Sequence, residues 1–110
     1  MNSWTADDRT KIAAALRDGA AVCGVPPHLR GGLDRYILDG ILPGGFLQAV
    51  LCADLIEVAL RADPVSLQSL PAVVQFLMFY APRECWRSRA AVLVWTITPD
   101  RLEISEPLEP

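Results

Sequence analysis

Hydrophobic residues recur along this chain at intervals of three and four, which predicts a succession of short helices. In the first of these, the apolar face includes Ile12 and Leu16. The Thr5 hydroxyl can cap the free amides at the start of this helix, with Asp8 completing a capping box. Gly19 is a stop signal. We therefore expect a first helix from about Thr5 to Gly19.

A proline- and glycine-rich stretch over residues 26–46 predicts a second helix between two breaks. Pro26 and Pro27 suit a helix start, because proline at the first helical position loses no hydrogen bond. Gly40 can cap the end. The apolar positions that share one face are Leu29, Leu33, Tyr36 and Ile37.

A third helical segment starts at Pro43 and contains an internal capping signal. Its apolar positions run through residues 46–62, and Asp54 with Glu57 has the spacing of a second helix start. The pattern thus fits one helix or two, with a kink near residues 52–54.

A fourth segment, from Pro64 to Tyr80, is interrupted by Pro71. Asp63 can cap its start. Pro71 should kink or restart the helix, with Ser69 as a local cap. The second half is apolar nearly all round, which places it at the centre of the core or against a partner.

The last segment gives conflicting signals. Ser88 can cap a helix that runs to Trp95, whereas residues 92–97 are rich in residues that favour strands. Residues 98–101 fit a type I turn. The alternative to a helix is therefore a hairpin that pairs residues 92–97 with residues 102–105; we favour the helix.

These patterns predict an all-α fold, a compact bundle of about five short helices that ends in an extended acidic tail or, in the alternative, a β-hairpin. A chain of 110 residues suffices for one core. We expect one domain over residues 1–98 and a flexible tail over residues 99–110. The expected core consists of Leu33, Ile37, Leu47, Val50, Leu51, Leu55, Val74 and Leu77.

Charge separates the expected tail from the rest. The chain has 10 basic and 13 acidic residues, a net charge of −3. Residues 99–110 hold four of the acidic residues and one arginine, so the remainder is neutral. Sequence-independent nucleic-acid binding needs a basic footprint, and we expect none. A hydrophobic content of 52% indicates apolar surface available to a partner or a second copy.

The cysteines and the apolar runs exclude further classes of protein. Cys23, Cys52 and Cys85 are too far apart for a zinc knuckle or a disulfide framework, so we interpret them as reduced small hydrophobes. The longest nearly apolar run, residues 70–82, is shorter than the about 20 residues of a spanning helix. The polar, acidic N-terminus does not fit a secretory signal, so we expect a cytoplasmic protein without a membrane partner.

Two glycine pairs, Gly31–Gly32 and Gly44–Gly45, begin two similar segments. A phosphate-binding loop would need a preceding strand and a following Lys-Ser/Thr, and neither occurs. We therefore predict that these glycines serve close helix packing. Anion binding by free amides at the start of the third helix is the alternative.

Most of the chain, from Val25 to Trp95, carries a recognisable pattern. It includes PPHLRGGLDRYILDGILPGGFLQAVL, then DLIEVALRAD and LPAVVQFLMFYAP. This resembles a group of small proteins encoded by bacteriophages and prophages, with the pattern PPHxxGGLxRYIxxGIxPGxFLxAVL and no settled function. The resemblance implies a phage or prophage origin and a compact helical fold, and it carries over no catalytic residue. Over Cys85–Ser88 the chain departs from the pattern, which has a glycine before the serine.

No catalytic arrangement is evident in the sequence. His28 is the only histidine, and no metal-ligand spacing or cofactor motif occurs, so we expect no metal and no cofactor. We expect a non-enzymatic protein that binds a host protein, for example to inhibit a host defence system such as CRISPR; a homodimer is also compatible. The candidate partner-binding residues are Arg30, Arg35, Tyr36, Arg83, Trp86, Arg87 and Arg89.

Two alternatives from other classes stay open. Residues 36–46 can be interpreted as a helix-turn-helix pair, as in a small dimeric DNA-associated regulator, although the neutral charge argues against it. Cys85 or Cys23 with His28 could form a thiol–imidazole pair in a hydrolase, although the spacing gives no support.

Overall fold

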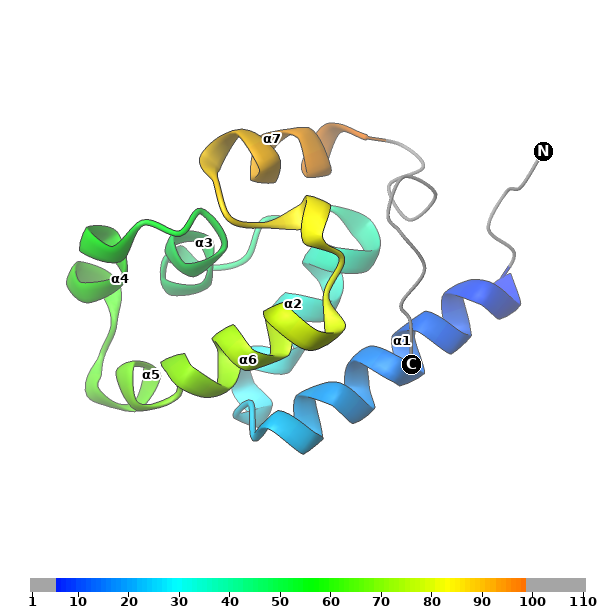
Figure 1. Ribbon diagram of the computed structural model, residues 1–110, viewed down its shortest axis with the longest axis horizontal. Coiled ribbons are helices and arrows are strands. Elements are labelled where there is room, and N and C mark those ends of the chain that lie inside the picture. Colours follow the sequence, from blue (N-terminus) through cyan, green and yellow to red (C-terminus); the bar gives the residue numbers. More distant parts are fainter. Residues whose placement is uncertain (1–5, 99–110) are drawn as a thin grey trace.

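Seven α-helices and one 3₁₀ turn follow one another along residues 6–98, the part of the chain that the computed structural model describes (Figure 1). No strand occurs among these residues, so the predicted all-α class is confirmed there. The predicted tail over residues 99–110 lies outside them. The elements are α1 (Ala6–Cys23), α2 (Pro27–Asp39), α3 (Gly45–Leu51), α4 (Leu55–Arg61), α5 (Pro64–Gln68), α6 (Leu70–Tyr80), η1 (Arg83–Cys85) and α7 (Arg89–Ile97).

The first helix is longer than predicted. It passes through Gly19 and ends at Cys23, where Gly24 takes a left-handed conformation with φ of 80°. Gly19 is buried, and a Cβ there would collide with the ring of Tyr80. The stop prediction at Gly19 was wrong, because this glycine serves close packing between α1 and α6. The predicted cap at Thr5 lies outside the described residues.

The predicted bounds of α2 are confirmed. Pro27 occupies its first turn, and Gly40 follows its end with φ of 69°. The Gly40 amide donates a hydrogen bond to the Tyr36 carbonyl at 2.9 Å. A residue with a Cβ would be strained in this left-handed conformation, so glycine at this position stops the helix.

The break inside the third predicted segment is a full separation into α3 and α4. Ala53 takes a left-handed conformation, with φ of 57°. The Asp54 carboxylate then caps α4 by accepting a hydrogen bond from the Glu57 amide at 3.2 Å. The two-helix alternative, with its predicted cap, is confirmed.

The fourth predicted segment is likewise two helices, α5 and α6. The Asp63 carboxylate caps α5 by accepting from the Ser66 amide at 2.7 Å, as predicted. The predicted cap at Ser69 is absent, because its hydroxyl donates to the Ser66 carbonyl at 2.6 Å instead. Ser69 thus closes the end of α5, and Pro71 lies in the first turn of α6.

Helix, and not hairpin, is found at the end of the described chain. The Ser88 hydroxyl accepts from the Ala91 amide at 3.0 Å and caps α7. Residues 92–97, the first strand of the hairpin alternative, are helical, which overturns that alternative. Its second strand, residues 102–105, lies outside the described residues.

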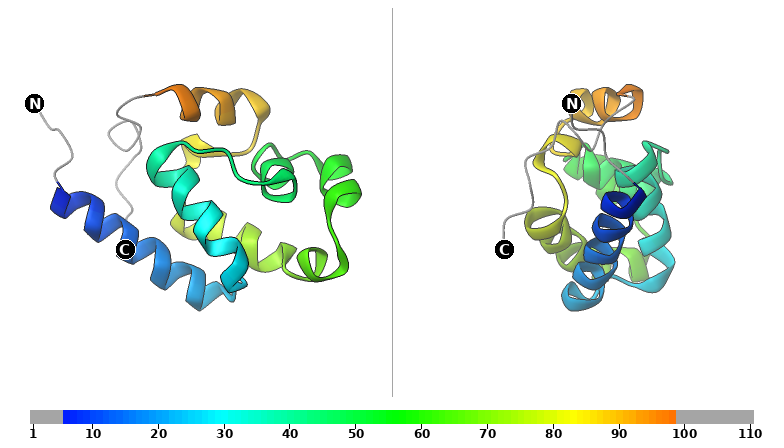
Figure 2. Two further views of the ribbon diagram at one scale, coloured as in Figure 1. Left: turned by 180° about the vertical axis from the view of Figure 1, so that it is seen from behind. Right: turned by 90° about the vertical axis from the view of Figure 1, so that its right-hand side faces the viewer.

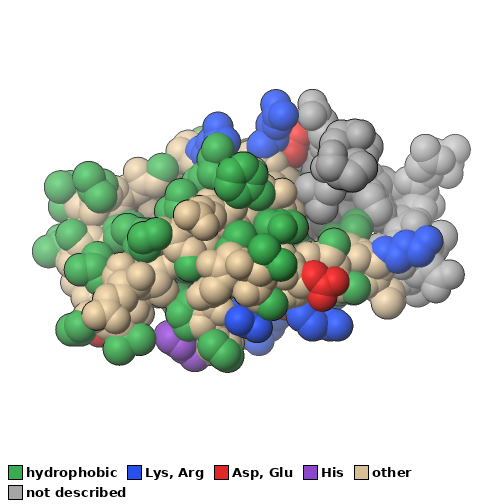
Figure 3. Space-filling view, turned by 60° about the horizontal axis from the view of Figure 1, so that its bottom comes forward, with side chains coloured by type: hydrophobic (Ala, Val, Ile, Leu, Met, Phe, Trp, Pro, Cys, Tyr) green, Lys and Arg blue, Asp and Glu red, His purple; other side chains and the backbone are tan. Residues whose placement is uncertain are grey.

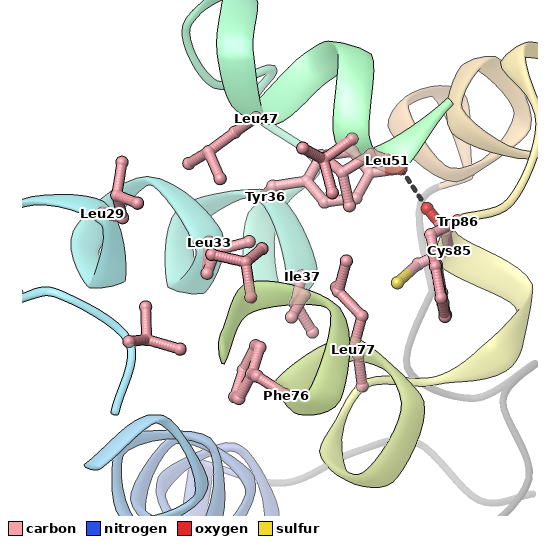
Figure 4. Close-up of a cluster of buried hydrophobic side chains, with 14 of the residues drawn as sticks. Leu29, Leu33, Tyr36, Ile37, Leu47, Leu51, Phe76, Leu77, Cys85 and Trp86 are labelled. Atoms are coloured by element: carbon pink, nitrogen blue, oxygen red, sulfur yellow. Dashed lines mark hydrogen bonds between the residues drawn. The ribbon is translucent and has the colours of Figure 1, made fainter. Parts of the chain in front are cut away.

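The core lies between α1, α2, α3 and α6, with η1 and α7 closing one side. Seen from behind, α2 runs between α1 and α3 (Figure 2). Side chains from α2, α3, α6 and η1 converge on one cluster (Figure 4). At its centre are Leu33, Tyr36, Ile37, Leu51, Phe76, Leu77 and Cys85, none with measurable exposure.

Six of the eight predicted core residues are buried: Leu33, Ile37, Leu47, Val50, Leu51 and Leu77. Val74 is half-buried and packs against the core. Leu55 is 73% exposed, and its assignment to the core was wrong. The left-handed break at Ala53 rotates α4 so that Val58 is the residue it buries.

No helix among the described residues is long and apolar enough to cross a membrane.

Candidate interaction surfaces

Arg87 lies between the second half of α6 and the start of α7, in a geometry that the fold holds tightly. Its backbone has φ of 95°, which residues with a Cβ rarely adopt. Its amide donates to the Leu51 carbonyl at 2.7 Å, which fixes the turn to the end of α3. Its guanidinium lies 5.0 Å from the ring centroid of Trp86, and Nη2 is 3.3 Å from Sδ of Met78.

Exposed apolar side chains lie on the last turn of α6, where Met78 contacts this arginine. Met78 is 50% and Phe79 is 73% exposed on α6, while Trp86 is buried except for 8% of its surface. Arg83 is exposed at the start of η1. We call these five residues, Met78, Phe79, Arg83, Trp86 and Arg87, the α6–η1 surface. It contains three of the seven predicted partner-binding residues.

The other three predicted arginines lie outside the α6–η1 surface. Arg89 forms a long ion pair with Asp54 across 3.9 Å. Arg30 donates from Nε to the Val25 carbonyl at 2.7 Å and so fastens the connection between α1 and α2. Arg35 is exposed and lines a pocket described below. The seven candidates therefore do not form one continuous group.

Tyr36, which was predicted to bind a partner, lies in the interior of the protein. It has no measurable exposure, and its hydroxyl donates to the Cys85 carbonyl at 2.6 Å (Figure 4). In this structure it cannot touch a partner. Its position four residues before Gly40 and one turn after Leu33 places it on the buried stripe of α2, which the helical spacing already indicated.

Two pockets flank the segment from Pro43 to Gly45. The larger, ≈ 560 Å³, lies between α2 and the start of α5, with His28, Arg35 and Asp63 among its lining residues. The smaller, ≈ 420 Å³, is lined by Gln48, Asp54, Glu57 and Arg89 among others. Arg61 lines both, and its Nε is 2.8 Å from the Glu57 carboxylate. Acidic and basic groups are mixed in each, so neither pocket selects one sign of charge.

The predicted packing role of the glycine pairs can be checked by the space around each glycine. A Cβ at Gly32 would lie 3.4 Å from a Leu47 methyl carbon, an ordinary van der Waals contact, so α2 could pack on α3 without a glycine at this position. A Cβ at Gly44 would meet nothing within 4 Å. The packing prediction therefore finds no support at Gly32 and is contradicted at Gly44, which lines both pockets.

The thiol–imidazole alternative lacks an accessible nucleophile at Cys85. This residue has no measurable exposure, and burial, reinforced by the Glu84 carboxylate, raises the pKa of its thiol to about 12. Such a thiol stays protonated at neutral pH, whereas thiol nucleophiles react as thiolates. His28 is exposed in the first turn of α2, close enough to Asp63 to help lower the pKa of that carboxyl group after the hydrogen bonds from Ser66.

A metal site finds no support in the part of the chain described. No group of three or more His, Cys, Asp or Glu side chains there could hold an ion. Asp34 is half-buried beside Arg17, Arg30 and Arg35; burial raises the pKa of its carboxyl group, and these three arginines partly oppose the rise.

The helix-turn-helix interpretation of residues 36–46 requires a second helix with side chains free to enter a groove. The second helix would be α3, which buries Phe46, Leu47, Ala49, Val50 and Leu51. Its one long polar side chain, Gln48, donates to the Pro43 carbonyl at 3.1 Å. Helix α3 is thus a core helix and offers no base-reading face.

The structure also shows a second surface, which the sequence analysis did not predict. It consists of exposed apolar residues on α4 and α5: Leu55, Ile56, Ala59, Leu60, Val65 and Leu67, here called the α4–α5 surface. Figure 3 shows apolar side chains gathered over that end of the molecule. The sequence signal was the segment LIEVALR, whose apolar residues extend round more of the helix than one buried stripe requires.

Comparisons with known proteins give no relative for this chain. A scan against protein-family models, a search of curated proteins and a search of solved structures each found no match.

Proposed function

We propose that this chain is a non-enzymatic protein that acts by binding another protein through the α6–η1 surface. The observation that carries the proposal is the contact of Arg87 with the exposed Met78 and with the ring of Trp86, together with the exposure of Phe79, the next residue of α6. Aromatic residues, methionine and arginine are the residue types enriched in protein interfaces, and aromatic–arginine clusters dominate their binding energy.

The arginine at the centre of this surface is already held in place. The contacts with Trp86 and Met78 restrict the Arg87 side chain before any partner arrives. A side chain that is ordered beforehand loses less entropy on binding, and this favours affinity. A positive φ at a residue other than glycine costs about 1–3 kcal/mol, a strain typical of binding sites.

The chemistry of the surface also describes its partner. Arg87 places positive charge in contact with the apolar Met78, and Arg83 is exposed at the start of η1. The complementary surface is an apolar protein segment that carries carboxylates at its edge. The resemblance to small phage and prophage proteins supports a bacterial host protein as the target, and a component of a defence system such as CRISPR as its class.

The test is recovery of a host protein by the tagged full-length chain from nuclease-treated bacterial lysate, with three variants in parallel. Phe79→Glu removes the exposed aromatic ring. Arg87→Gly removes the guanidinium and suits the positive φ, so the fold is preserved. Val22→Glu is the matched control, because Val22 is 76% exposed on α1, outside the surface.

We expect one host protein to be recovered near stoichiometrically with the natural chain and with Val22→Glu, and to be lost with Phe79→Glu and Arg87→Gly. Binding of the purified host protein, measured by calorimetry, should show the same order. Equal recovery by all four chains would exclude the α6–η1 surface as the binding site. Recovery of no host protein by any of them would contradict the proposed function.

A further inference from the structure

Helix α4 turns most of its large apolar side chains to solvent. Leu55, Ile56 and Leu60 are 73%, 69% and 74% exposed, and only Val58 is buried, at 5%. A surface helix normally presents its apolar stripe to the core and polar residues to water. The solvent face of α4 is thus more apolar than the face that packs on α3.

The exposed residues form one continuous stripe. At 100° per residue, Leu55, Ala59, Ile56 and Leu60 cover an arc of about 140°. Glu57 and Arg61 lie along one flank of this arc and are paired with each other at 2.8 Å. Val65 and Leu67, 60% and 51% exposed, extend the apolar region onto α5. No charged side chain interrupts the stripe itself.

The charge distribution favours a second copy of the chain as the occupant. The flank of α4 is self-complementary, because it carries one acidic and one basic residue one helical turn apart. In an antiparallel pair of helices related by a two-fold axis, equivalent flanks lie side by side in opposite directions.

We propose that the α4–α5 surface is a dimer interface in which α4 packs antiparallel against α4 of a second copy about a two-fold axis near Ala59. The small side chain of Ala59 allows the two helices to approach closely. Glu57 of each copy then lies opposite Arg61 of the other. Isologous two-fold contacts of this kind are the commonest in homo-oligomers.

The size of the surface sets the strength of the dimer. Stable interfaces bury about 20–30 residues on each side, whereas α4 and α5 together are shorter than that. The dimer is therefore weak, and it dissociates on dilution. The dimer leaves the α6–η1 surface free. The dimer proposal can therefore be tested independently of the proposed function.

The first test is sedimentation of the full-length chain over about 1–500 µM, the range in which weak dimers dissociate. We expect a shift from monomer to dimer as the concentration rises. Leu60→Glu should keep the chain monomeric throughout, because it places a carboxylate in the stripe of each copy. Val22→Glu, the control on α1, should dimerise like the natural chain. A natural chain that is monomeric at every concentration would overturn the proposal.

The second test addresses the antiparallel register. Arg61→Glu makes the flank of α4 wholly acidic, and Glu57→Arg makes it wholly basic. Each variant alone should dimerise about tenfold more weakly, because like charges then face each other across the axis. An equimolar mixture of the two should recover the affinity as a heterodimer. Failure of the mixture to recover it, with circular dichroism showing both variants folded, would overturn the register.

Discussion

Two buried side chains join parts of the molecule that are far apart in sequence. Tyr36 donates its hydroxyl to the Cys85 carbonyl, and Trp95 donates its indole N–H to the carbonyls of Tyr36 and Ile37 at 3.1 and 3.2 Å. These hydrogen bonds join the end of α2 to η1 and to α7. Removing a donor from a buried carbonyl lowers the free energy of unfolding, because the carbonyl then has no replacement partner from water.

The Tyr36 hydroxyl gives the first prediction. Tyr36→Phe keeps the ring but leaves the Cys85 carbonyl without this donor, and we expect the free energy of unfolding to fall by about 1–3 kcal/mol. Tyr80→Phe is the control, because its ring packs on Phe76 but its hydroxyl makes no described hydrogen bond. Urea denaturation measures both. A similar loss in the two variants would show that the hydroxyl of Tyr36 is not what stabilises the core.

Gly19 and Gly31 should respond to alanine with opposite signs. Both are inside helices, where alanine is favoured over glycine by about 0.5–1 kcal/mol. At Gly31 a Cβ meets only the flexible end of Arg35, so Gly31→Ala should stabilise the protein by about this amount. At Gly19 a Cβ collides with the Tyr80 ring, and overpacking of this kind costs about 1–3 kcal/mol, so Gly19→Ala should destabilise it. Thermal unfolding of both variants checks the signs, and a stabilised Gly19→Ala would contradict the packing of α1 on α6.

The three cysteines should differ in reactivity. Cys23 and Cys52 are half-buried, whereas Cys85 is fully buried with a pKa raised to about 12. Alkylation of the folded protein at neutral pH should modify Cys23 and Cys52 first and Cys85 last, because only the exposed thiolate reacts. Peptide mapping by mass spectrometry gives the three rates, with denatured protein as the reference for equal exposure. Labelling of Cys85 as fast as Cys52 would exclude its burial.

At the scale of the elements, the sequence could predict those helix starts and ends that depend on interactions between neighbouring residues. Gly40, Asp54, Asp63 and Ser88 act through neighbouring backbone groups, and the helix starts and stops they indicated are found. Gly19 could not be assigned this way, because its role depends on Tyr80, 61 positions along the chain. Leu55 was assigned to the core because periodicity shows that a stripe is apolar, but not which side of it faces the core.

The candidate surfaces likewise contain residues that sequence proximity indicated and residues that only the fold brings together. Arg83, Trp86 and Arg87 were predicted to bind a partner because they are close in the sequence, but Arg89, which was predicted with them, is paired with Asp54. Met78 joins these residues only through the fold, because the turn after α6 brings Arg87 back to it. The α4–α5 surface was missed because no single residue in it is unusual, and the apolar excess of LIEVALR does not show which of its residues face solvent.

The cap of α7 provides the prediction at this scale. Ser88→Ala removes the hydroxyl that accepts from the Ala91 amide, and such losses cost about 1 kcal/mol. Ser88→Asp should retain most of the stability, because a carboxylate also caps and favours the positive end of the helix dipole. Urea denaturation of both compares them. If Ser88→Ala were as stable as the natural chain, α7 would not depend on this cap.

For the whole molecule, the described part consists of a well-buried body and a peripheral end. Helices α1, α2, α3 and α6 supply most of the buried side chains, whereas α4 and α5 bury only Val58 and Ser66 between them. We expect α4 and α5 to unfold locally more often than the other helices, because elements with few buried contacts open at low free energy. The peripheral end is also the proposed dimer interface, so association should stabilise it selectively.

Hydrogen exchange measured on the natural chain and on Leu60→Glu at one high concentration tests this coupling. In the monomeric variant, amides of α4 and α5 should exchange faster than those of α2 and α6, which lie in the core. In the natural chain at that concentration, the proposed dimer covers α4 and α5, so their exchange should slow while that of α2 and α6 stays the same. Equal protection of α4 in both chains would mean that the helix needs no second copy to be held. Slower exchange throughout the natural chain would instead mean that association stabilises the molecule as one cooperative unit.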